Sequence, residues 1–528
     1  MGETPDRVAL DLPIIAAELA VINSVAAGRT PKTLSNIRSD LLAAVRASGL
    51  QPLLASSKAG LSPSWTDLLA KLPGKRTRIG LSRLARYASA AGLTPGEIGD
   101  AAIAKFIGDV RKGSLHHNPN ALYRKTAAIW NEARNALPQL GLRPVTRPSF
   151  RGPPKRVDWG ILTDAFRADV EKYLAWCAGA DAFAADARPR TLAPRTLKLR
   201  RNQIHAAATA LIDSGIALAS ITGLGDLVTI DHFRRILRQR HRAAAEQENA
   251  FNRDLAEALV QIAREWIRVD VMVLAELKRL TSKMPMPKAG LTAKNKRAVR
   301  QFDDPAAVRR VLEFPARLWA EVRRDQKPNF RTLAKAQAAL AIAILSYIPL
   351  RLQNLHALTF DTHIFLRDKN RATSSLEVAA DEVKNKTELA FDIPQHIVTM
   401  LIEYRDRVAP SVIGRRPERV FVVADGKPKS QAMLALLITK TLSKRAGVTL
   451  TAHQFRHLSA KLILDAEHGA YETVRQLLGH RSLKTTVRFY TGIETRRAAR
   501  HHQHLIETAL AAAPVIPTRT SRSGRRRG

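Results

Sequence analysis

Apolar residues recur at helical spacing along most of the chain, and Ala, Leu and Arg dominate these amphipathic stretches. Two stretches begin alike: 30–34 reads TPKTL and 193–197 reads APRTL, and apolar residues follow both at helical spacing. In each, Pro can set the first helical turn and Thr is close enough to cap it. A true duplication would make two small helical modules in tandem, and chance agreement is the equal alternative.

Short apolar runs typical of strands are concentrated between His363 and Pro394. The runs 363–366, 376–378 and 389–393 are separated by polar residues, and a basic stretch at 384–387 precedes the third. This pattern predicts a small antiparallel sheet with a basic hairpin tip. The expected fold class is therefore mainly α with a small antiparallel β-sheet in the C-terminal part.

Proline and glycine divide the chain into parts. Residues 141–158 hold four prolines among basic residues and are interpreted as a linker. A second break at 281–300 has basic residues and no acid, so it suits a strap along a phosphate backbone, with a bare solvated loop as the alternative. The Arg-rich tail 514–528 is expected to be disordered, adding either DNA affinity or solubility. The basic residues of the second break are Lys283, Lys288, Lys294, Lys296, Arg297 and Arg300.

Charge narrows the class of partner. The chain of 528 residues has 85 Lys and Arg against 47 Asp and Glu, a net charge of +38. Such an excess attracts polyanions, either nucleic acid or an anionic membrane. No apolar run reaches the roughly 18 residues that a membrane span needs, so nucleic acid is favoured and a cytoplasmic, nucleoid-associated protein is expected. Cys177 is the only cysteine, which excludes an intrachain disulfide and a cysteine-built zinc site.

Four clusters in the C-terminal part carry candidate chemistry. An arginine follows an apolar stretch, a basic hairpin comes next, then His-x-x-Arg in HQFR, and finally Gly-His followed by a tyrosine. Each cluster alone has a plain interpretation, such as a helix-end charge or a solvated turn. Their joint order is the specific signal. The residues are Arg351, Lys384, His453, Arg456, His480 and Tyr490.

This ordered set resembles the tyrosine recombinase (phage integrase) family, over roughly residues 303–510. The segment LLGHRSLKTTVRFY is its most diagnostic piece. The resemblance implies a multidomain architecture: a helical module at 1–150 whose role is open (an additional DNA-binding domain is one candidate), a helical core-binding domain at 159–284, a basic linker at 285–302, the catalytic domain at 303–510 and the tail at 514–528. It also implies that recombination joins two DNA sites within a tetramer, with accessory recombinases or DNA-bending proteins as further candidate partners.

The residue types fit attack on a phosphodiester. Two guanidiniums, Arg351 and Arg456, can grip the phosphate oxygens bidentately. A tyrosine hydroxyl has a pKa near 10 and needs activation, so His453 is assigned to take the proton of Tyr490. Lys384 can donate to the leaving 5′ oxygen, and His480 can hydrogen-bond the phosphate. None of the usual carboxylate clusters for a metal is evident, so no metal or other cofactor is expected. The 3′-phosphotyrosine conserves the bond energy, so a free 5′ hydroxyl can reverse the attack without ATP.

Four departures from the family pattern accompany the resemblance. Tyr490 is ten positions after His480, where nine is common, and Asn354 stands where an acidic residue is common. Lys386 competes with Lys384 for the hairpin role, and Lys384 is preferred because VKN falls where the second strand is expected to end. The region before the first linker is longer than the usual arm of the family.

The resulting hypothesis is a site-specific recombinase or integrase that serves integration, excision or transposition of a mobile element. Two alternatives stay open. A type IB topoisomerase uses a similar residue set to relax supercoils. A noncatalytic DNA-binding protein descended from a recombinase would keep the basic surface without the reaction.

Overall fold

The computed structural model describes residues 11–49, 60–150, 156–181, 183, 185, 187–244, 249–285, 290–367, 373–467, 469–484, 486–487, 489–490, 502–503 and 505–508. Over these residues the chain is mainly helical with one three-stranded antiparallel sheet, which confirms the predicted fold class. The chain divides into two compact units, one formed by 148–288 and the other by 1–147 and 289–528. Among the residues described, none of the helices is both long and apolar enough to cross a membrane.

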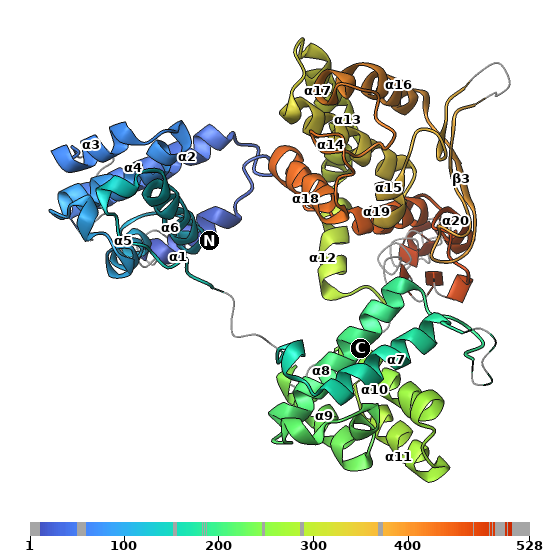
Figure 1. Cartoon of the computed structure of the whole chain (residues 1–528). Helices are drawn as coiled ribbons and strands as arrows, with labels where there is room; N and C mark the ends of the chain where they lie inside the picture. The colour runs from blue at the N-terminus through green and yellow to red at the C-terminus, as the bar shows by residue number, and fades with distance from the viewer. Residues whose placement is uncertain are drawn as a thin grey trace, which may run out of the picture. The chain divides into compact units, whose positions relative to one another are not determined.

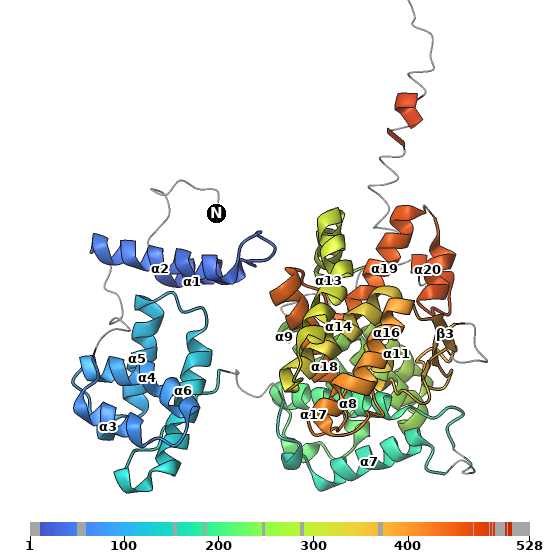
Figure 2. The same ribbon diagram turned by 90° about the horizontal axis from the view of Figure 1, so that it is seen from above.

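The N-terminal part is a helical bundle with a tryptophan-centred core (Figures 1 and 2). Trp65 and Trp130 are fully buried with ring centroids 6.1 Å apart, and each indole nitrogen donates to a backbone oxygen. The acceptor for Trp130 is Arg143, so the start of the predicted linker 141–158 is packed onto the bundle. The helices are α1 (Leu12–Val21), α2 (Pro31–Ser48), α3 (Pro63–Lys71), α4 (Lys75–Ala90), α5 (Asp100–Gly113) and α6 (Pro119–Ala136).

The two similar helix starts fold differently in detail. Thr30 caps α2 by accepting from the backbone nitrogen of Thr33 at 3.0 Å, and Gly49 ends the helix in the left-handed conformation. Helix α8 (Pro194–Asp213) begins after Ala193 with no side-chain cap, so the predicted Thr cap is wrong there. Helix α8 also lies deep in its core, whereas α2 has only Val45 fully buried. The likeness of the two stretches therefore does not extend to equivalent packing.

The unit 148–288 is a second helical bundle with its own core. Asp169 ties it together, because one carboxylate oxygen accepts from the backbone nitrogen of Leu224 and the other from the indole of Trp266. Phe166 and Tyr173 are among its buried aromatic residues. Its helices, besides α8, are α7 (Asp164–Ala178), α9 (Ile230–Ala243), α10 (Ala250–Ile262) and α11 (Val271–Ser282).

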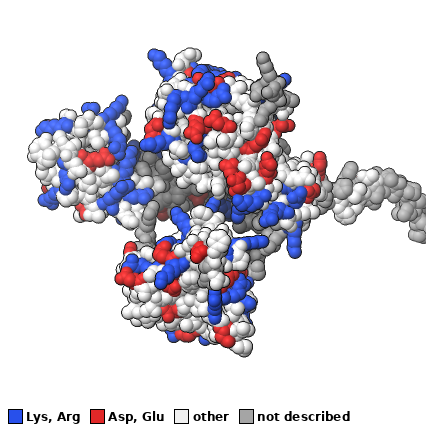
Figure 3. All heavy atoms as spheres, turned by 45° about the vertical axis from the view of Figure 1, so that its right-hand side comes forward, with Lys and Arg blue, Asp and Glu red and all other residues white. Residues whose placement is uncertain are grey.

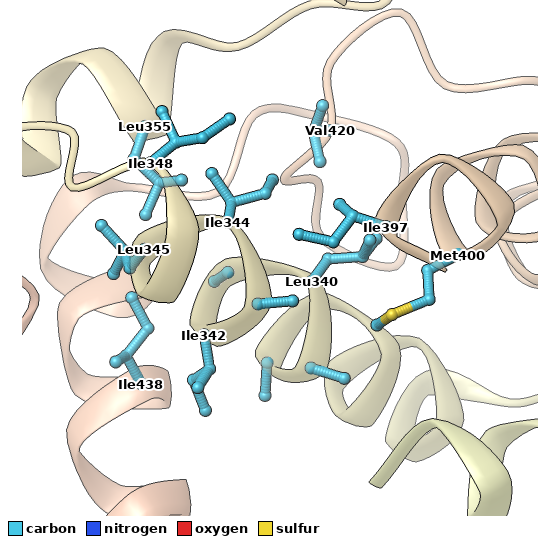
Figure 4. Close-up of a cluster of buried hydrophobic side chains, with 14 of the residues drawn as sticks. Leu340, Ile342, Ile344, Leu345, Ile348, Leu355, Ile397, Met400, Val420 and Ile438 are labelled. Carbon is cyan, nitrogen blue, oxygen red and sulfur yellow. The ribbon is translucent and has the colours of Figure 1, made fainter. Parts of the chain in front are cut away.

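Helix α14 (Phe330–Tyr347) is the centre of the C-terminal part. Figure 4 shows its apolar side chains against residues of α15, α16, α18 and the segment at Val420. Burying each large apolar side chain contributes about 1.5–3 kcal/mol, so the end of this helix is held firmly. The apolar stretch continues to Leu350, but the helix ends at Tyr347 because Pro349 disfavours helical geometry in the residue before it.

The other helices of this part surround α14 (Figure 1). They are α12 (Ala293–Arg300), α13 (Pro305–Arg324), α15 (Leu352–Ala357), α16 (Gln395–Glu403), α17 (Pro410–Ile413), α18 (Gln431–Thr441), α19 (Ala452–Ala466) and α20 (Tyr471–Leu477).

The predicted sheet is present as β1 (Ile364–Phe365), β2 (Ser375–Val378) and β3 (Leu389–Asp392), in the order β1-β2-β3. Both pairings are antiparallel, and Leu376 lies opposite Ile364 on one side and Phe391 on the other. The turn that joins β2 to β3 carries the basic residues predicted for the hairpin tip.

The segment predicted as a basic linker, 285–302, contains helix α12. Thr292 caps this helix, and Gln454 of α19 donates to Asn295 at 3.2 Å. Leu291 and Val299 are buried beside α19 and α20. A cap and an apolar side therefore make 293–300 a packed helix and not a bare loop, and contact of its basic residues with a phosphate backbone stays a prediction.

Lys and Arg side chains are spread over the visible face, with Asp and Glu in smaller groups among them (Figure 3). Of the six basic residues singled out at 281–300, Lys288 lies outside the described residues, as does the tail 514–528. The other five are exposed: Lys283 just after α11, and Lys294, Lys296, Arg297 and Arg300 on α12.

Candidate active site

Arg351 stands at the N-terminus of α15, just after the buried end of α14. Its backbone is extended, and the residues before it are packed in the core. The guanidinium is half-buried, and burial lowers its pKa. Its Nη1 is buried and has no hydrogen-bond partner among the described residues. Arg351 therefore keeps a donor available for an anion.

Arg456, on α19, is 4% exposed and connects three segments of the site. Its Nη1 donates to the backbone oxygen of Pro349 at 2.8 Å, and its Nη2 donates to that of Leu478 at 2.6 Å. Nη2 also lies 3.3 Å from Nε2 of His480. Burial and then the charge of Arg351 lower the pKa of Arg456 to about 10, so the guanidinium stays charged at neutral pH. Two positive charges thus share one partly desolvated site.

His480 lies in the loop after α20, held between Arg456 and Thr486. Because an arginine can only donate, Nε2 of His480 accepts from Arg456, and Nδ1 carries the proton and donates to Oγ1 of Thr486 at 2.9 Å. Burial, then Arg456 and Arg351, lower its pKa to about 4. His480 is therefore neutral, and its Nε2 can donate to a phosphate only after Arg456 turns away and a proton is gained.

Gly479 allows the close approach of this loop to the sheet. Its φ is +56°, and a Cβ at this position would lie 2.9 Å from Cδ2 of Leu389. The backbone oxygen of Gly479 accepts from Nδ2 of Asn385 at 2.6 Å. The β2–β3 turn is thereby tied to the loop that carries His480.

Lys384 and Lys386 lie in that turn, and both are exposed. Strand β2 ends at Val378, so Lys384 is not at the strand end as predicted but within the turn. Lys386 donates its Nζ to the backbone oxygen of Asp381 at 3.0 Å and has a φ of +54°. Among the described residues, Lys384 has no hydrogen-bond or ion-pair partner. Lys384 is thus the lysine whose ammonium group is available, which is an argument for its preference over Lys386.

Tyr490 is buried, with an exposed fraction of 2%. Its ring lies in an apolar cluster formed by α12, α19 and α20. Burial raises its pKa to about 12, and the charge of Arg456 opposes this rise. The phenol oxygen lies 2.9 Å from Nδ1 of His457. The buried neighbours in the cluster are Leu291, Val299, Ala460, Leu464, Val474 and Leu478.

His453 occupies the first turn of α19 and is exposed to solvent. Partial desolvation, then Arg456 and Arg351, lower its pKa. Its ring lies edge-on to that of His457, with centroids 5.1 Å apart. In the described part of the chain no hydrogen bond joins His453 to Tyr490, although His453 was assigned to take the phenol proton. The structure brings His453 to the site but not to the hydroxyl.

Asn354 is buried, and its Nδ2 has no partner among the described residues. No hydrogen bond between Asn354 and Arg351 is found there either. An acidic side chain at this position would offer acceptors where the amide nitrogen offers only donors. The outer contact to Arg351 that the family pattern implies is therefore absent from the described residues.

His457 is the residue that the sequence reasoning missed. It follows Arg456 directly in HQFRH and stands four residues after His453. That spacing puts both imidazoles on one face of a helix, and this was the available signal. Asn385, which anchors the turn, carried no comparable signal.

Comparison with known proteins shows which family the C-terminal part resembles. Residues 325–497 match the phage integrase family. A lambda integrase tetramer bound to a Holliday junction is 16% identical over 67% of this chain and 87% of that chain, with a TM-score of 0.36. XerH site-specific recombinase bound to palindromic difH substrate, in a post-cleavage complex, is 13% identical over 86% of this chain and 99% of that chain, with a TM-score of 0.37. No curated protein sequence matches the chain.

The matched residues include Arg351, Arg456, His480 and Tyr490, which interact directly or through their charges in one pocket. Residues 325–497 are thus similar to the tyrosine recombinase (phage integrase) family, as the ordered set of residues in the sequence indicated.

Proposed function

We propose that this chain is a site-specific DNA recombinase that cuts and rejoins DNA through a 3′-phosphotyrosine at Tyr490. The observation that carries the proposal is the convergence of Arg351, Arg456, His480 and Tyr490 in one desolvated pocket. Two guanidiniums there can hold one phosphate bidentately, and a phenol is beside them. The match to the phage integrase family supports the same reaction class.

In the proposed reaction, the phenol oxygen of Tyr490 forms a bond to the phosphorus, and the bond to the 5′ oxygen breaks. Arg351 and Arg456 stabilise the charge that develops on the non-bridging oxygens, which is usually the largest catalytic contribution. Lys384 gives a proton to the leaving 5′ oxygen. A free 5′ hydroxyl reverses these steps, so rejoining needs no ATP.

The described state fits a DNA-free enzyme. Tyr490 is buried, and donors of Arg456 are engaged with His480 and with backbone oxygens. A phosphate entering between the two arginines competes for these donors. Arg351, with its free Nη1, provides the first contact, and Arg456 the second after it leaves His480.

Binding to DNA is proposed to use the helical unit 148–288 and the exposed basic side of α12. Most contacts would go to phosphates, with a few side chains contacting base edges. Recombination of two duplexes requires that protomers assemble on DNA, and a tetramer is the assembly proposed here. Integration, excision or transposition of a mobile element is the process that such an enzyme would serve.

The test uses nicked duplexes cut from the DNA that flanks the gene for this chain, so that the cleaved end diffuses away and the adduct accumulates. We expect a covalent protein–DNA adduct that is lost in Tyr490→Phe. The matched control is Tyr347→Phe, a tyrosine of α14 that is 53% exposed and outside the pocket. This control should form adduct at the wild-type rate.

The same preparations separate the alternatives. Joining of two duplexes that carry different labels supports a recombinase. Relaxation of supercoiled plasmid without joining supports a type IB topoisomerase. DNA binding without any adduct supports a noncatalytic protein and refutes the proposed function.

A further inference from the structure

The nucleophile contacts a histidine to which the proposed reaction gives no role. The phenol oxygen of Tyr490 lies 2.9 Å from Nδ1 of His457, and the two rings meet edge to face with centroids 5.7 Å apart. His457 is 5% exposed, so this contact is shielded from solvent. We propose that His457, and not His453, takes the phenol proton when Tyr490 attacks; the inference rests on the proposed function.

Geometry is the first argument. A general base must lie within about 2.6–3.2 Å of the atom that gives up the proton. His457 meets this requirement before any DNA is bound. His453 is one helical turn earlier on α19, exposed to solvent, and makes no hydrogen bond to the phenol in the described part of the chain. Its edge-on contact with His457, with ring centroids 5.1 Å apart, makes it a neighbour of the base.

The step balances within the site. The phenol proton moves to Nδ1 of His457, the phenol oxygen bonds to phosphorus, and the departing 5′ oxygen takes a proton from Lys384. During rejoining, Lys384 takes that proton back from the 5′ hydroxyl, and His457 returns its own to the departing oxygen of Tyr490. No proton has to be exchanged with solvent between the two half-reactions.

Electrostatics explains how the base is switched on. Burial, then His453, Arg456 and His480, lower the pKa of His457 to about 4, so the free enzyme holds a neutral imidazole that is a weak base. A phosphate anion bound by the two arginines offsets the charge of Arg456. The pKa of His457 then rises toward its ordinary value, and the imidazole becomes a competent base only when substrate is present.

The described elements packed around His457 and Tyr490 contribute mainly apolar side chains. Helices α12 and α20 contribute apolar residues to this cluster. On α19 the next charged residue, Lys461, is paired with Asp303 at 2.9 Å and with Asp465 at 2.8 Å. The titration of His457 should therefore depend mainly on Arg456, on its two histidine neighbours and on the bound phosphate.

The experiment measures the rate of adduct formation between pH 5 and pH 9, on the same nicked duplexes, for the full chain and for His457→Asn and His453→Asn. Asn can still hydrogen-bond the phenol but cannot take up a proton at these pH values. We expect His457→Asn to lower the rate on the order of 10²- to 10⁴-fold and to abolish the rise of rate with pH. His453→Asn should keep that rise and lose less rate.

Two results would overturn the inference: a wild-type rate in His457→Asn, which leaves only a structural role, or loss of the pH dependence in His453→Asn alone. His457→Gln, a second neutral replacement, serves if the Asn variant is unstable in thermal unfolding. Gel-shift affinity for the duplex should match the wild type in all variants. Failure of the wild-type chain to form any Tyr490-dependent adduct refutes the proposed function itself, and so is distinguishable.

Discussion

Two buried tyrosines in the C-terminal part show what separates a core from a reactive pocket. Tyr404, 0% exposed, lies in the large core around α14, and its hydroxyl accepts from Nε2 of Gln337 at 2.9 Å. Tyr490, 2% exposed, lies in the small cluster between α12, α19 and α20 and contacts His457. Burial raises the pKa of both phenols. Burial alone therefore does not distinguish them.

The difference is in the polar groups nearby. Around Tyr404, Nε2 of Gln337 also donates to the backbone oxygen of Val422, and in the described part of the chain no charged group shifts the pKa of this phenol. Around Tyr490 lie Arg456 and His457, and Nε2 of His457 is buried without a partner among the described residues. Such unpaired buried groups each cost about 1–3 kcal/mol. Oε1 of Gln337, beside Tyr404, is also buried without a partner among the described residues, so an unpaired buried atom does not by itself mark a reactive site. What Tyr490 has and Tyr404 lacks among the described residues is a charged neighbour, Arg456.

The largest expected effect comes from removing each hydroxyl in turn. Tyr490→Phe should abolish adduct formation, while Tyr404→Phe should keep it and lower the free energy of unfolding by about 1 kcal/mol through the lost hydrogen bond. Urea denaturation and adduct gels measure the two effects on the same preparations. Loss of adduct in a folded Tyr404→Phe variant would contradict the assignment of Tyr404 to a purely structural role.

The next largest effect comes from Arg→Lys changes, which keep the charge and remove the bidentate grip. Arg351→Lys and Arg456→Lys should each slow adduct formation on the order of 10²- to 10³-fold. Only Arg456→Lys should also destabilise the fold, by about 1–3 kcal/mol, because the oxygens of Pro349 and Leu478 lose their donors. Equal stability losses in the two variants, measured by urea denaturation, would contradict the assignment of Arg351 as the arginine with a free donor.

Much of this site was predictable because its residues lie in short sequence motifs or next to apolar runs whose secondary structure the sequence indicates. The apolar stretch before Arg351 and the alternating run of β3 fix their own secondary structure. The His-x-x-Arg pair and the Gly-His pair then meet because α19 and the loop after α20 follow one another along the chain, and Tyr490 comes ten positions after His480. Order along the chain was therefore enough to nominate Arg456, His480 and Tyr490 for one pocket.

The rest depended on contacts that no local pattern contains. The burial of Tyr490 needs α12, a stretch of chain whose basic character was given more weight than the cap at Thr292 and the apolar Val299. The choice of histidine at the phenol depends on how far α19 is rotated about its axis. Spacing puts His453 and His457 on one face but does not say which of them reaches the hydroxyl.

A smaller effect is expected from adding a side chain at Gly479, where the loop that carries His480 lies close to the sheet. Gly479→Ala should cost about 2 kcal/mol, because alanine is strained at positive φ and its Cβ would meet Leu389. The displaced loop carries His480, so adduct formation should also slow about 10-fold. Gly469→Ala is the control, because its φ is +82° and an added Cβ would have no atom within 4 Å. This variant should lose about 1 kcal/mol of stability with no change in the rate of adduct formation. Thermal unfolding and adduct rates of the pair separate backbone strain from loop displacement.

The smallest effect is a pH dependence of stability that the pocket has and the core lacks. The folded-state pKa values of His457 and His480 are about 4, below the ordinary 6.5, so the unfolded chain binds more protons as pH falls. Stability should therefore fall between pH 6.5 and pH 5, before most carboxylates titrate, by about 1 kcal/mol per histidine after allowance for solvent screening.

Urea denaturation of the wild type and of His457→Asn at pH 5 and pH 7 measures this effect, and the variant should lose about 1 kcal/mol of the dependence. A curve that is flat in both proteins would mean that the imidazoles already carry protons in the native state. A protonated His457 has no lone pair at Nδ1 for the proton of Tyr490, so this small difference in stability bears directly on how the nucleophile is activated.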